Sequence, residues 1–338
     1  MFLVVSQHIT TFWGDAQAVQ DSVLDQTLMT FRMPLFFFIS GFIAYKSAEY
    51  WNLSFFKQRM ITKAQVQLIP AVLFFMLFAL CYGKNPLGFL SNGFGGFWFT
   101  PVLFGMFCIY FPCCYLLRNR PKLLDTVFII IAVIAAVVVS VLTILGILTN
   151  IHPIFIEVLK FDSILYYFEF FILGHFIHKY EKEAFSLLSK DWINLVAIIV
   201  FTASILIIMQ IRGGGILSVF VYSVRTYIAR YAGLFIIFSF FIRQCKYFAK
   251  GGLLSRVMQY VGRHTLDIYM IHNFFLPMNI DIIHTIVKTA SHNVITQILV
   301  EGSFATIIIA ICLLISNILR NSNTLSHYLF GVKRITSN

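Results

Sequence analysis

Four ionisable side chains stand inside long apolar runs of the sequence: His8, Arg32, Glu169 and His272. An ionisable group at membrane depth is costly to bury, so such residues are functional candidates by default. Histidine titrates near neutral pH and suits proton transfer, whereas arginine keeps its charge and suits anion binding. Plainer explanations stand beside these: His8 as an interfacial residue, Arg32 extending to the interface, and Glu169 and His272 as hydrogen-bonded groups between helices.

A basic, amphipathic stretch follows the second apolar run and leads into Pro70. It carries the three cations Lys57, Arg59 and Lys63. Cations so placed could hold phosphate groups at a membrane surface. Anionic lipid headgroups and membrane topology account for them equally well.

Several other chemistries lack their sequence signatures. No Walker A loop occurs, which argues against ATP-driven work, and no serine stands in a nucleophile elbow. The pair His175-x-x-His178 has helical spacing, but a solvated helix face is favoured over a metal site at this helix end. The six cysteines lie in or beside apolar runs without paired metal-site spacing, which favours packing over nucleophilic chemistry. We therefore expect no metal site.

The amino-acid composition indicates which kind of secondary structure holds these residues. Of the 338 residues, 59% are hydrophobic and 12% are charged, and the mean hydropathy is +0.85. Soluble domains have about 25% charged residues, so a soluble globular enzyme is excluded, as are a disordered chain and a coiled-coil rod. The apolar runs are continuous rather than alternating, which excludes an outer-membrane β-barrel. The expected fold is all-α, a polytopic membrane helical bundle that forms a single domain over residues 1–338.

About ten transmembrane helices are expected, since each needs about 20 residues. They cover residues 1–13, 29–47, 66–83, 97–117, 125–149, 163–179, 193–211, 217–242, 264–283 and 294–319. The first is short, about 20 Å of helix against about 30 Å of hydrocarbon. We expect this first helix to be truncated, with the chain starting late; a genuine half-span is the alternative. It lacks the basic region and cleavage site of a signal peptide.

Basic residues alternate between successive loops. Loops after the even-numbered spans contain most of the Lys and Arg, whereas the loop after the first span contains Asp15, Asp21 and Asp25 and no basic residue. The positive-inside rule places the even-numbered loops and both termini in the cytoplasm. The net charge of +11 then reflects topology and contact with membrane lipids, and no nucleic-acid partner is expected.

Five segments, in order along the chain, resemble motifs of the acyltransferase family 3 membrane proteins. Residues 31–42, FRMPLFFFISGF, resemble the second-span motif of that family and are the most specific of the five. The others are residues 3–8 ending in His8, the basic segment 56–70, the segment 98–104 that begins with Trp98, and residues 262–272 ending in His272. The family comprises bacterial O-acyltransferases, including fucose 4-O-acetylase-like enzymes.

The chain departs from the family pattern at three places. The family's first-span Arg and its nearby Asp would precede Met1. The family often has His-Met-Pro where this chain has Arg32-Met33-Pro34, and a second Arg where Lys63 stands.

The resemblance implies transfer of an acetyl group from acetyl-CoA, as co-substrate, to a hydroxyl of a cell-envelope or exported carbohydrate at the bacterial inner membrane. It implies His8 as general base, because a sugar hydroxyl is a weak nucleophile, and Arg32 as stabiliser of the thioester oxyanion. The phosphates of CoA are expected on the basic stretch, at Lys57, Arg59 and Lys63. Three further candidates have no assigned step: Glu169, Trp98 and His272.

Two other kinds of protein fit the same features. A transporter or flippase of a lipid-linked sugar or small solute would also bury His, Arg and Glu in about ten spans. An inactive relative that acts as an assembly partner is a third possibility. The sequence leaves open the sugar acceptor and the choice between acetyl and a longer acyl donor such as succinyl.

Overall fold

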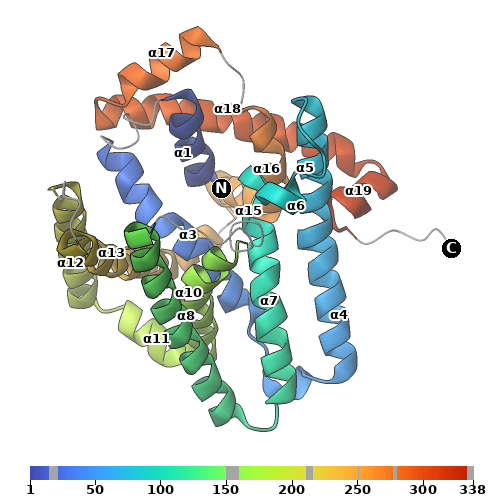
Figure 1. The fold of residues 1–338 in the computed structure, drawn as a ribbon, viewed down its shortest axis with the longest axis vertical. Coiled ribbons are helices and arrows are strands. Elements are labelled where there is room, and N and C mark those ends of the chain that lie inside the picture. The colour runs from blue at the N-terminus through green and yellow to red at the C-terminus, as the bar shows by residue number, and fades with distance from the viewer. Residues whose placement is uncertain (15–21, 150–159, 211–215, 250, 277–279, 333–338) are drawn as a thin grey trace. The chain divides into compact units, whose positions relative to one another are not determined.

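The computed structural model describes residues 1–14, 22–149, 160–210, 216–249, 251–276 and 280–332 (Figure 1). Every regular element within these ranges is a helix, which confirms the all-α expectation. Six of the helices are long and apolar enough to cross a membrane, or seven if the bent pair α11–α12 counts as one span. A polytopic membrane bundle is therefore confirmed. Three of the ten expected spans have no counterpart among these helices. The spans 1–13 and 264–283 correspond to helices that are too short, with 12 residues in α1 and 7 in α16, and the span 163–179 corresponds to a helix of 19 residues, Phe161–Lys179, that is not among the apolar candidates.

Contacts divide the chain into two compact units. The first unit comprises Met1–Ile39, Phe176–Thr265 and Phe275–Ile311. It contains α1 (Phe2–Trp13), α3 (Val23–Ala44) up to Ile39, α11 (Glu181–Leu188), α12 (Asp191–Gln210), α13 (Ile216–Arg243), α14 (Cys245–Ala249), α15 (Leu253–Arg263), α17 (Asp281–Ala290) and α18 (Val294–Arg320) up to Ile311.

The second unit comprises Ser40–His175, Leu266–Phe274 and Cys312–Asn338. It contains η1 (Ala48–Tyr50), α4 (Leu53–Lys63), the π-helical segment η2 (Ala64–Leu68), α5 (Ile69–Cys81), α6 (Phe89–Asn92), η3 (Gly95–Phe97), α7 (Phe99–Leu116), α8 (Pro121–Thr149), α10 (Phe161–Lys179) up to His175, α16 (Thr265–Ile271), η4 (His272–Phe274) and α19 (Asn323–Phe330).

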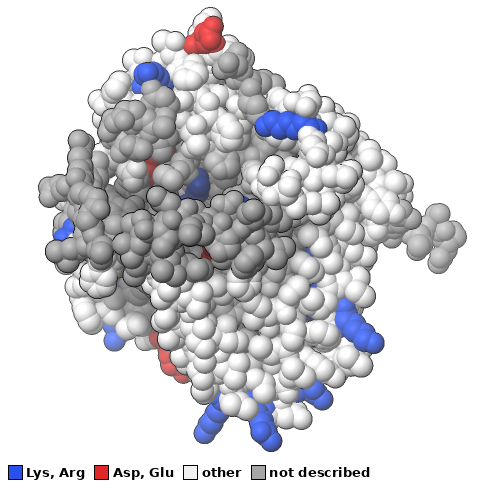
Figure 2. All heavy atoms as spheres, in the orientation of Figure 1, with Lys and Arg blue, Asp and Glu red and all other residues white. Residues whose placement is uncertain are grey.

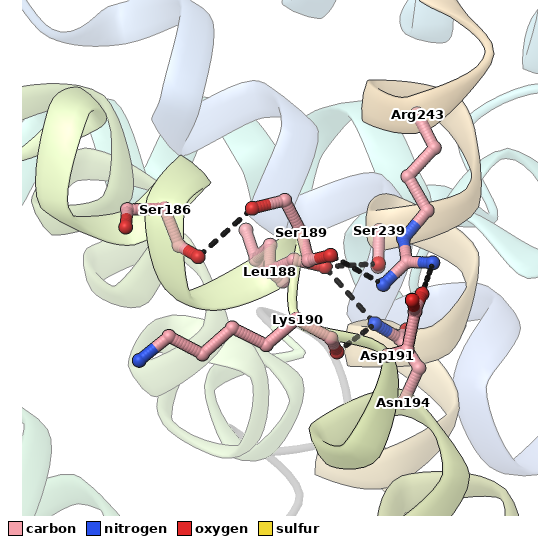
Figure 3. Close-up of polar contacts among 8 residues, drawn as sticks. All are labelled: Ser186, Leu188, Ser189, Lys190, Asp191, Asn194, Ser239 and Arg243. Carbon is pink, nitrogen blue, oxygen red and sulfur yellow. Dashed lines mark hydrogen bonds and ion pairs between the residues drawn. The ribbon is translucent and has the colours of Figure 1, made fainter.

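In the first unit α12 and α13 run side by side, and polar contacts fix the corner that leads into α12 (Figures 1 and 3). The chain turns by 72° between α11 and α12. Ser239 on α13 donates to the carbonyl of Leu188 at 2.7 Å, and Arg243 donates to Asp191 at 2.5 Å. Asn194 donates to the carbonyls of Leu188 and Lys190, each at 3.0 Å. Ser239 and Asn194 thereby satisfy the carbonyl of Leu188, which the end of α11 leaves without a helical partner.

In the second unit α4, η2 and α5 form one continuous apolar span, Leu53–Cys81, that packs against α7 (Figure 1). The sequence predicted a loop here and a span only from residue 66, and that boundary is wrong. Asn52 caps the helix by accepting from the backbone N–H of Phe55 at 2.8 Å. Pro70 cannot donate the helical bond to the carbonyl of Val66, and the π-helical segment lies just before it, as expected where the ladder is broken.

The expected span at 264–283 is not one α-helix, because α16 ends at Ile271. Two side chains bond to the last carbonyls of α16. His272 Nδ1 lies 2.9 Å from the carbonyl oxygen of Ile268, and Asn273 donates to the carbonyl of Tyr269 at 3.0 Å. Such local bonds compete with continuation of the helix. The amphipathic helix α17 follows after residues 277–279, which lie outside the described ranges.

Glycine at position 41 allows the end of α3 to approach α10 in the second unit. A Cβ atom there would collide with the backbone carbonyl of Phe171. Only glycine permits backbones to come this close. The close packing of α3 against α10 therefore explains the glycine of the FRMPLFFFISGF segment.

Charged groups gather at one end of the helices of the second unit. On the face that Figure 2 shows, Lys and Arg lie where α7 meets α8 and beside the start of α4. Lys57, Arg120 and Lys122 are exposed in these places. The distribution is typical of a membrane span with one basic face in water.

Candidate functional site

In the first unit a carboxylate of α18 holds α1 by two hydroxyl groups. Thr10 donates to Glu301 Oε1 at 2.6 Å, and Ser6 donates to Glu301 Oε2 at 3.0 Å. Glu301 is fully buried. Since Ser6 and Thr10 lie four residues apart on one helical face, these bonds fix both the rotation and the axial position of α1.

An amide links this carboxylate to a second one on α3. The Nε2 group of Gln297 donates to Glu301 Oε1 at 2.6 Å and to Asp25 Oδ2 at 2.9 Å. Ser22 donates to Oε1 of the same Gln297 at 2.8 Å. Asp25, Gln297 and Glu301 are fully buried, so three helices share one polar core. We call Ser6, Thr10, Ser22, Asp25, Gln297 and Glu301 the carboxyl cluster.

His8 lies on the side of α1 opposite the carboxyl cluster. It is two residues from both Ser6 and Thr10, and two residues of α-helix turn the side chain through about 200°. Its ring is half-buried and lies edge-on to Phe12, with 6.2 Å between ring centroids. The same bonds that bury one face of α1 therefore set the direction in which His8 points.

Arg32 packs against α1 from α3. It is 9% exposed, and its Nη1 lies 3.5 Å from the carbonyl oxygen of Leu3, five residues before His8. Arg32 and Asp25 are seven residues apart and share one face of α3. The structure thus places both predicted catalytic residues, His8 and Arg32, in the α1–α3 part of the first unit.

The basic stretch lies in the second unit, and its three cations have different surroundings. Lys57 is exposed. The Arg59 guanidinium lies over the ring of Phe55, with 4.8 Å from Cζ to the ring centroid. The Lys63 ammonium lies over the ring of Phe107 on α7, at 4.2 Å. Lys63 therefore lies where α4 packs against α7, Arg59 lies one turn earlier on the same face of α4, and Lys57 is at the surface.

The segments of Trp98 and His272 meet through a tyrosine. The Tyr269 hydroxyl donates to the carbonyl of Gly96 at 2.9 Å and accepts from the backbone N–H of Phe99 at 3.0 Å. This joins α16 to the start of α7. Trp98 stacks on Tyr167 of α10, with 6.1 Å between centroids, and His272 is fully buried.

Two further groups on α10 bear on the sequence predictions. Glu169 is half-buried, and its neighbours in sequence, Phe168 and Phe170, are fully buried. His175 is buried, and its Nδ1 lies 2.7 Å from the Tyr110 hydroxyl. The expectation of a solvated face at His175 is wrong, because the aromatic side chains of α7 and α8 cover it. No group of three His, Cys, Asp or Glu within the described ranges could hold a metal ion.

An ion pair anchors α16 to the last part of α18. Arg320 donates to both carboxylate oxygens of Asp267, from Nε at 2.8 Å and from Nη2 at 3.0 Å, and Ser316 donates to the same carboxylate. The carboxylate is buried while the guanidinium is partly exposed. Bidentate geometry of this kind fixes orientation as well as distance.

The sequence interpretation missed the carboxyl cluster, although two signals were present. Ser22 and Asp25 have the spacing of a capping box, and the N–H of Asp25 does bond to the Ser22 hydroxyl at 3.0 Å. That signal places the start of the second span at Val23 rather than at residue 29, with Asp25 inside it. Glu301 stands in the apolar run 294–319 and is subject to the same rule that singled out Glu169.

Comparison with models of protein families shows which family the chain belongs to. The model of the acyltransferase domain, Acyl_transf_3, matches residues 1–318 of the 338. The chain belongs to acyltransferase family 3. It is accordingly a membrane acyltransferase, and the match covers all of the segments that carry the sequence resemblance. No curated protein and no solved structure matches the chain.

Proposed function

We propose that this family 3 acyltransferase moves an acetyl group from acetyl-CoA to a hydroxyl of a cell-envelope or exported carbohydrate, at the bacterial inner membrane. The family match over residues 1–318 supports the acyl-transfer chemistry. The observation that supports His8 as general base is its place on α1, opposite two hydroxyl bonds to Glu301 that hold the helix in one register.

The reaction forms one ester bond and breaks one thioester bond. The acceptor hydroxyl attacks the carbonyl carbon of acetyl-CoA while His8 takes its proton. The tetrahedral intermediate collapses, the C–S bond breaks, and the thiolate of CoA takes the proton from His8. The products are the O-acetylated carbohydrate and CoA with a free thiol.

Arg32 supplies positive charge for the oxyanion of this intermediate. A buried cation that is already oriented stabilises developing charge without reorganisation. Its contact with the carbonyl of Leu3 keeps it on α1, the helix of His8. Lys57, Arg59 and Lys63 hold the phosphates of CoA, because charge-assisted bonds to phosphate are strong and cations are concentrated there.

The test is acetyl transfer in membranes that contain the chain. Acetyl-CoA labelled in its acetyl group is supplied on the cytoplasmic side, and label is measured in glycan, with membranes lacking the chain as control. The proposal predicts label in glycan with equal release of CoA thiol. Movement of a lipid-linked sugar or solute without consumption of acetyl-CoA would instead identify a transporter.

A further inference from the structure

In the second unit the buried polar atoms Gln67 Oε1 and Thr100 Oγ1 have no hydrogen-bond partner among the described residues. Gln67 is 6% exposed and Thr100 is 2% exposed. Most buried polar groups in proteins are paired, because an unpaired one loses its bonds to water and gains none. Each of these two atoms therefore calls for a partner.

Thr100 is the second residue of α7, so the carbonyl four residues before it lies outside the helix. Several other helical threonines donate to the carbonyl four residues earlier, as Thr30 does to Gln26 at 2.8 Å and Thr126 to Lys122 at 3.0 Å. For Thr100 that carbonyl belongs to Gly96, and it accepts the Tyr269 hydroxyl instead. The hydroxyl of Thr100 is thereby left with a proton to donate.

The π-helical segment η2 explains how Gln67 comes into line with the cations. Arg59 and Lys63 are four residues apart and share a face of α4. In an α-helix each step of four residues also turns the side chain about 40° around the helix axis. A π-helical turn takes more residues than an α-helical turn. Residue 67, four positions beyond Lys63 and inside η2, is therefore turned back toward the line of Arg59 and Lys63.

Thr100 lies along the same line on the opposing helix. The segment η2 packs against α7, which runs in the opposite direction to α4 and α5 (Figure 1). Lys63 lies over Phe107, and Thr100 precedes Phe107 by seven residues on the same face of α7. Measured from the Lys63–Phe107 contact, Thr100 lies about 10 Å farther along α7, at 1.5 Å per residue, and Gln67 lies about one helical turn farther in the same direction.

We infer that this line binds the pantetheine arm of the acyl-CoA donor, with Gln67 and Thr100 as the groups that recognise its amides. A secondary amide offers one N–H donor and one carbonyl acceptor. Gln67 Oε1 accepts from an amide N–H of the arm, and the Thr100 hydroxyl donates to an amide carbonyl. Arg59 and Lys63 hold the phosphates at the basic end. This inference rests on acetyl-CoA as the donor in the proposed function.

The experiment measures binding of two probes to the purified full chain in lipid nanodiscs. Acetyl-CoA contains the arm, and 3′-phosphoadenosine 5′-phosphate contains only the nucleotide. The variants are Gln67→Met and Thr100→Val, which remove one polar group each. The matched controls are Gln65→Met and Thr126→Val, at exposed positions of η2 and α8.

Each test variant is expected to weaken acetyl-CoA binding about five- to tenfold, the size of one hydrogen bond, and to leave nucleotide binding unchanged. Without ligand, Gln67→Met should unfold at an equal or higher temperature, since it removes a buried atom without a partner. Both controls should bind both probes as the unchanged chain does.

Unchanged acetyl-CoA affinity in both test variants would overturn the inference and leave the proposed donor standing. If the test variants lost binding of both probes and also unfolded at a lower temperature, Gln67 and Thr100 would have a purely structural role, and the inference would also be overturned. If the unchanged chain binds the nucleotide probe but not acetyl-CoA, or binds neither, the proposed donor itself fails and the inference falls with it.

Discussion

Thr10 and Glu301 are separated by 291 positions in the sequence, yet the hydroxyl of one donates to the carboxylate of the other at 2.6 Å. Ser6 makes the companion bond to the same carboxylate. A single buried side chain on α18 thus determines how α1 is rotated. Because His8 lies on the opposite face of α1, the first and last helices of the first unit, α1 and α18, jointly set the orientation of the proposed base.

Replacing Glu301 should therefore impair both stability and activity. Glu301→Ala leaves the hydroxyls of Ser6 and Thr10 without their acceptor, at a cost of about 1–3 kcal/mol in the free energy of unfolding. We expect at least tenfold slower acetyl transfer, because α1 loses its register. Glu301→Gln keeps an acceptor oxygen and should retain most of the stability and most of the activity. Thermal unfolding and acetyl transfer measure the two effects.

The exposed Ser303, two residues further along α18, provides the control. Ser303→Ala should be close to neutral in both assays. Full activity of Glu301→Ala would show that the carboxyl cluster does not position His8.

Reversing the charge of Arg59 should raise the apparent KM for acetyl-CoA about tenfold or more, since a charge-assisted bond to phosphate is replaced by repulsion. Steady-state kinetics with varied acetyl-CoA measure this. Arg120→Glu changes an exposed arginine at another basic turn of the same unit and is the control. An unchanged KM for Arg59→Glu, or an equal rise for Arg120→Glu, would contradict a specific phosphate contact.

The two ion pairs Asp267–Arg320 and Asp191–Arg243 allow a direct comparison. Asp267 is buried and bound bidentately, whereas the Asp191 side chain is 93% exposed. Asp267→Ala should lower the free energy of unfolding by about 2–4 kcal/mol, because it leaves Arg320 partly buried without its partner. Asp191→Ala should cost less than about 1 kcal/mol. Equal decreases in the free energy of unfolding of the two variants, measured by chemical denaturation, would contradict the prediction that the buried pair contributes more.

Tyr269→Phe should weaken the attachment of α16 to the start of α7. It removes the hydroxyl that bonds both Gly96 and Phe99, at a cost of about 1–3 kcal/mol. It also releases the Gly96 carbonyl to Thr100, so acetyl-CoA binding should weaken as it does for Thr100→Val. Tyr260→Phe, at an exposed position, is the control. Unchanged stability and binding in Tyr269→Phe would contradict the described geometry.

Much of the fold follows from the sequence, because long apolar runs leave few alternatives to helices in a membrane. The expected bounds 97–117 and 294–319 lie within two residues of α7 and α18. The boundary errors have local causes. The start of α3 depends on the Ser22 cap, and the end of α16 depends on side chains that bond its last carbonyls. Neither signal is visible in hydropathy alone.

The candidate site was less accessible to sequence reasoning. Charged residues in apolar runs could be singled out, but their pairing depends on tertiary contacts. The Ser6–Glu301 and Asp25–Gln297 bonds join segments more than 270 positions apart. The burial of His175 likewise depends on Tyr110 and Phe128 from other helices. No local pattern encodes such pairings.

The most direct test of the central claim is acetyl transfer to glycan by His8→Ala beside Thr11→Val, an exposed neighbour on the same helix. Loss of a general base typically costs about 10²–10⁴ in rate. The account predicts a fall of at least about 100-fold in kcat for His8→Ala, with acetyl-CoA affinity unchanged and Thr11→Val near normal. Transfer by His8→Ala at a rate within about twofold of the unchanged chain, far outside that range, would contradict His8 as the base.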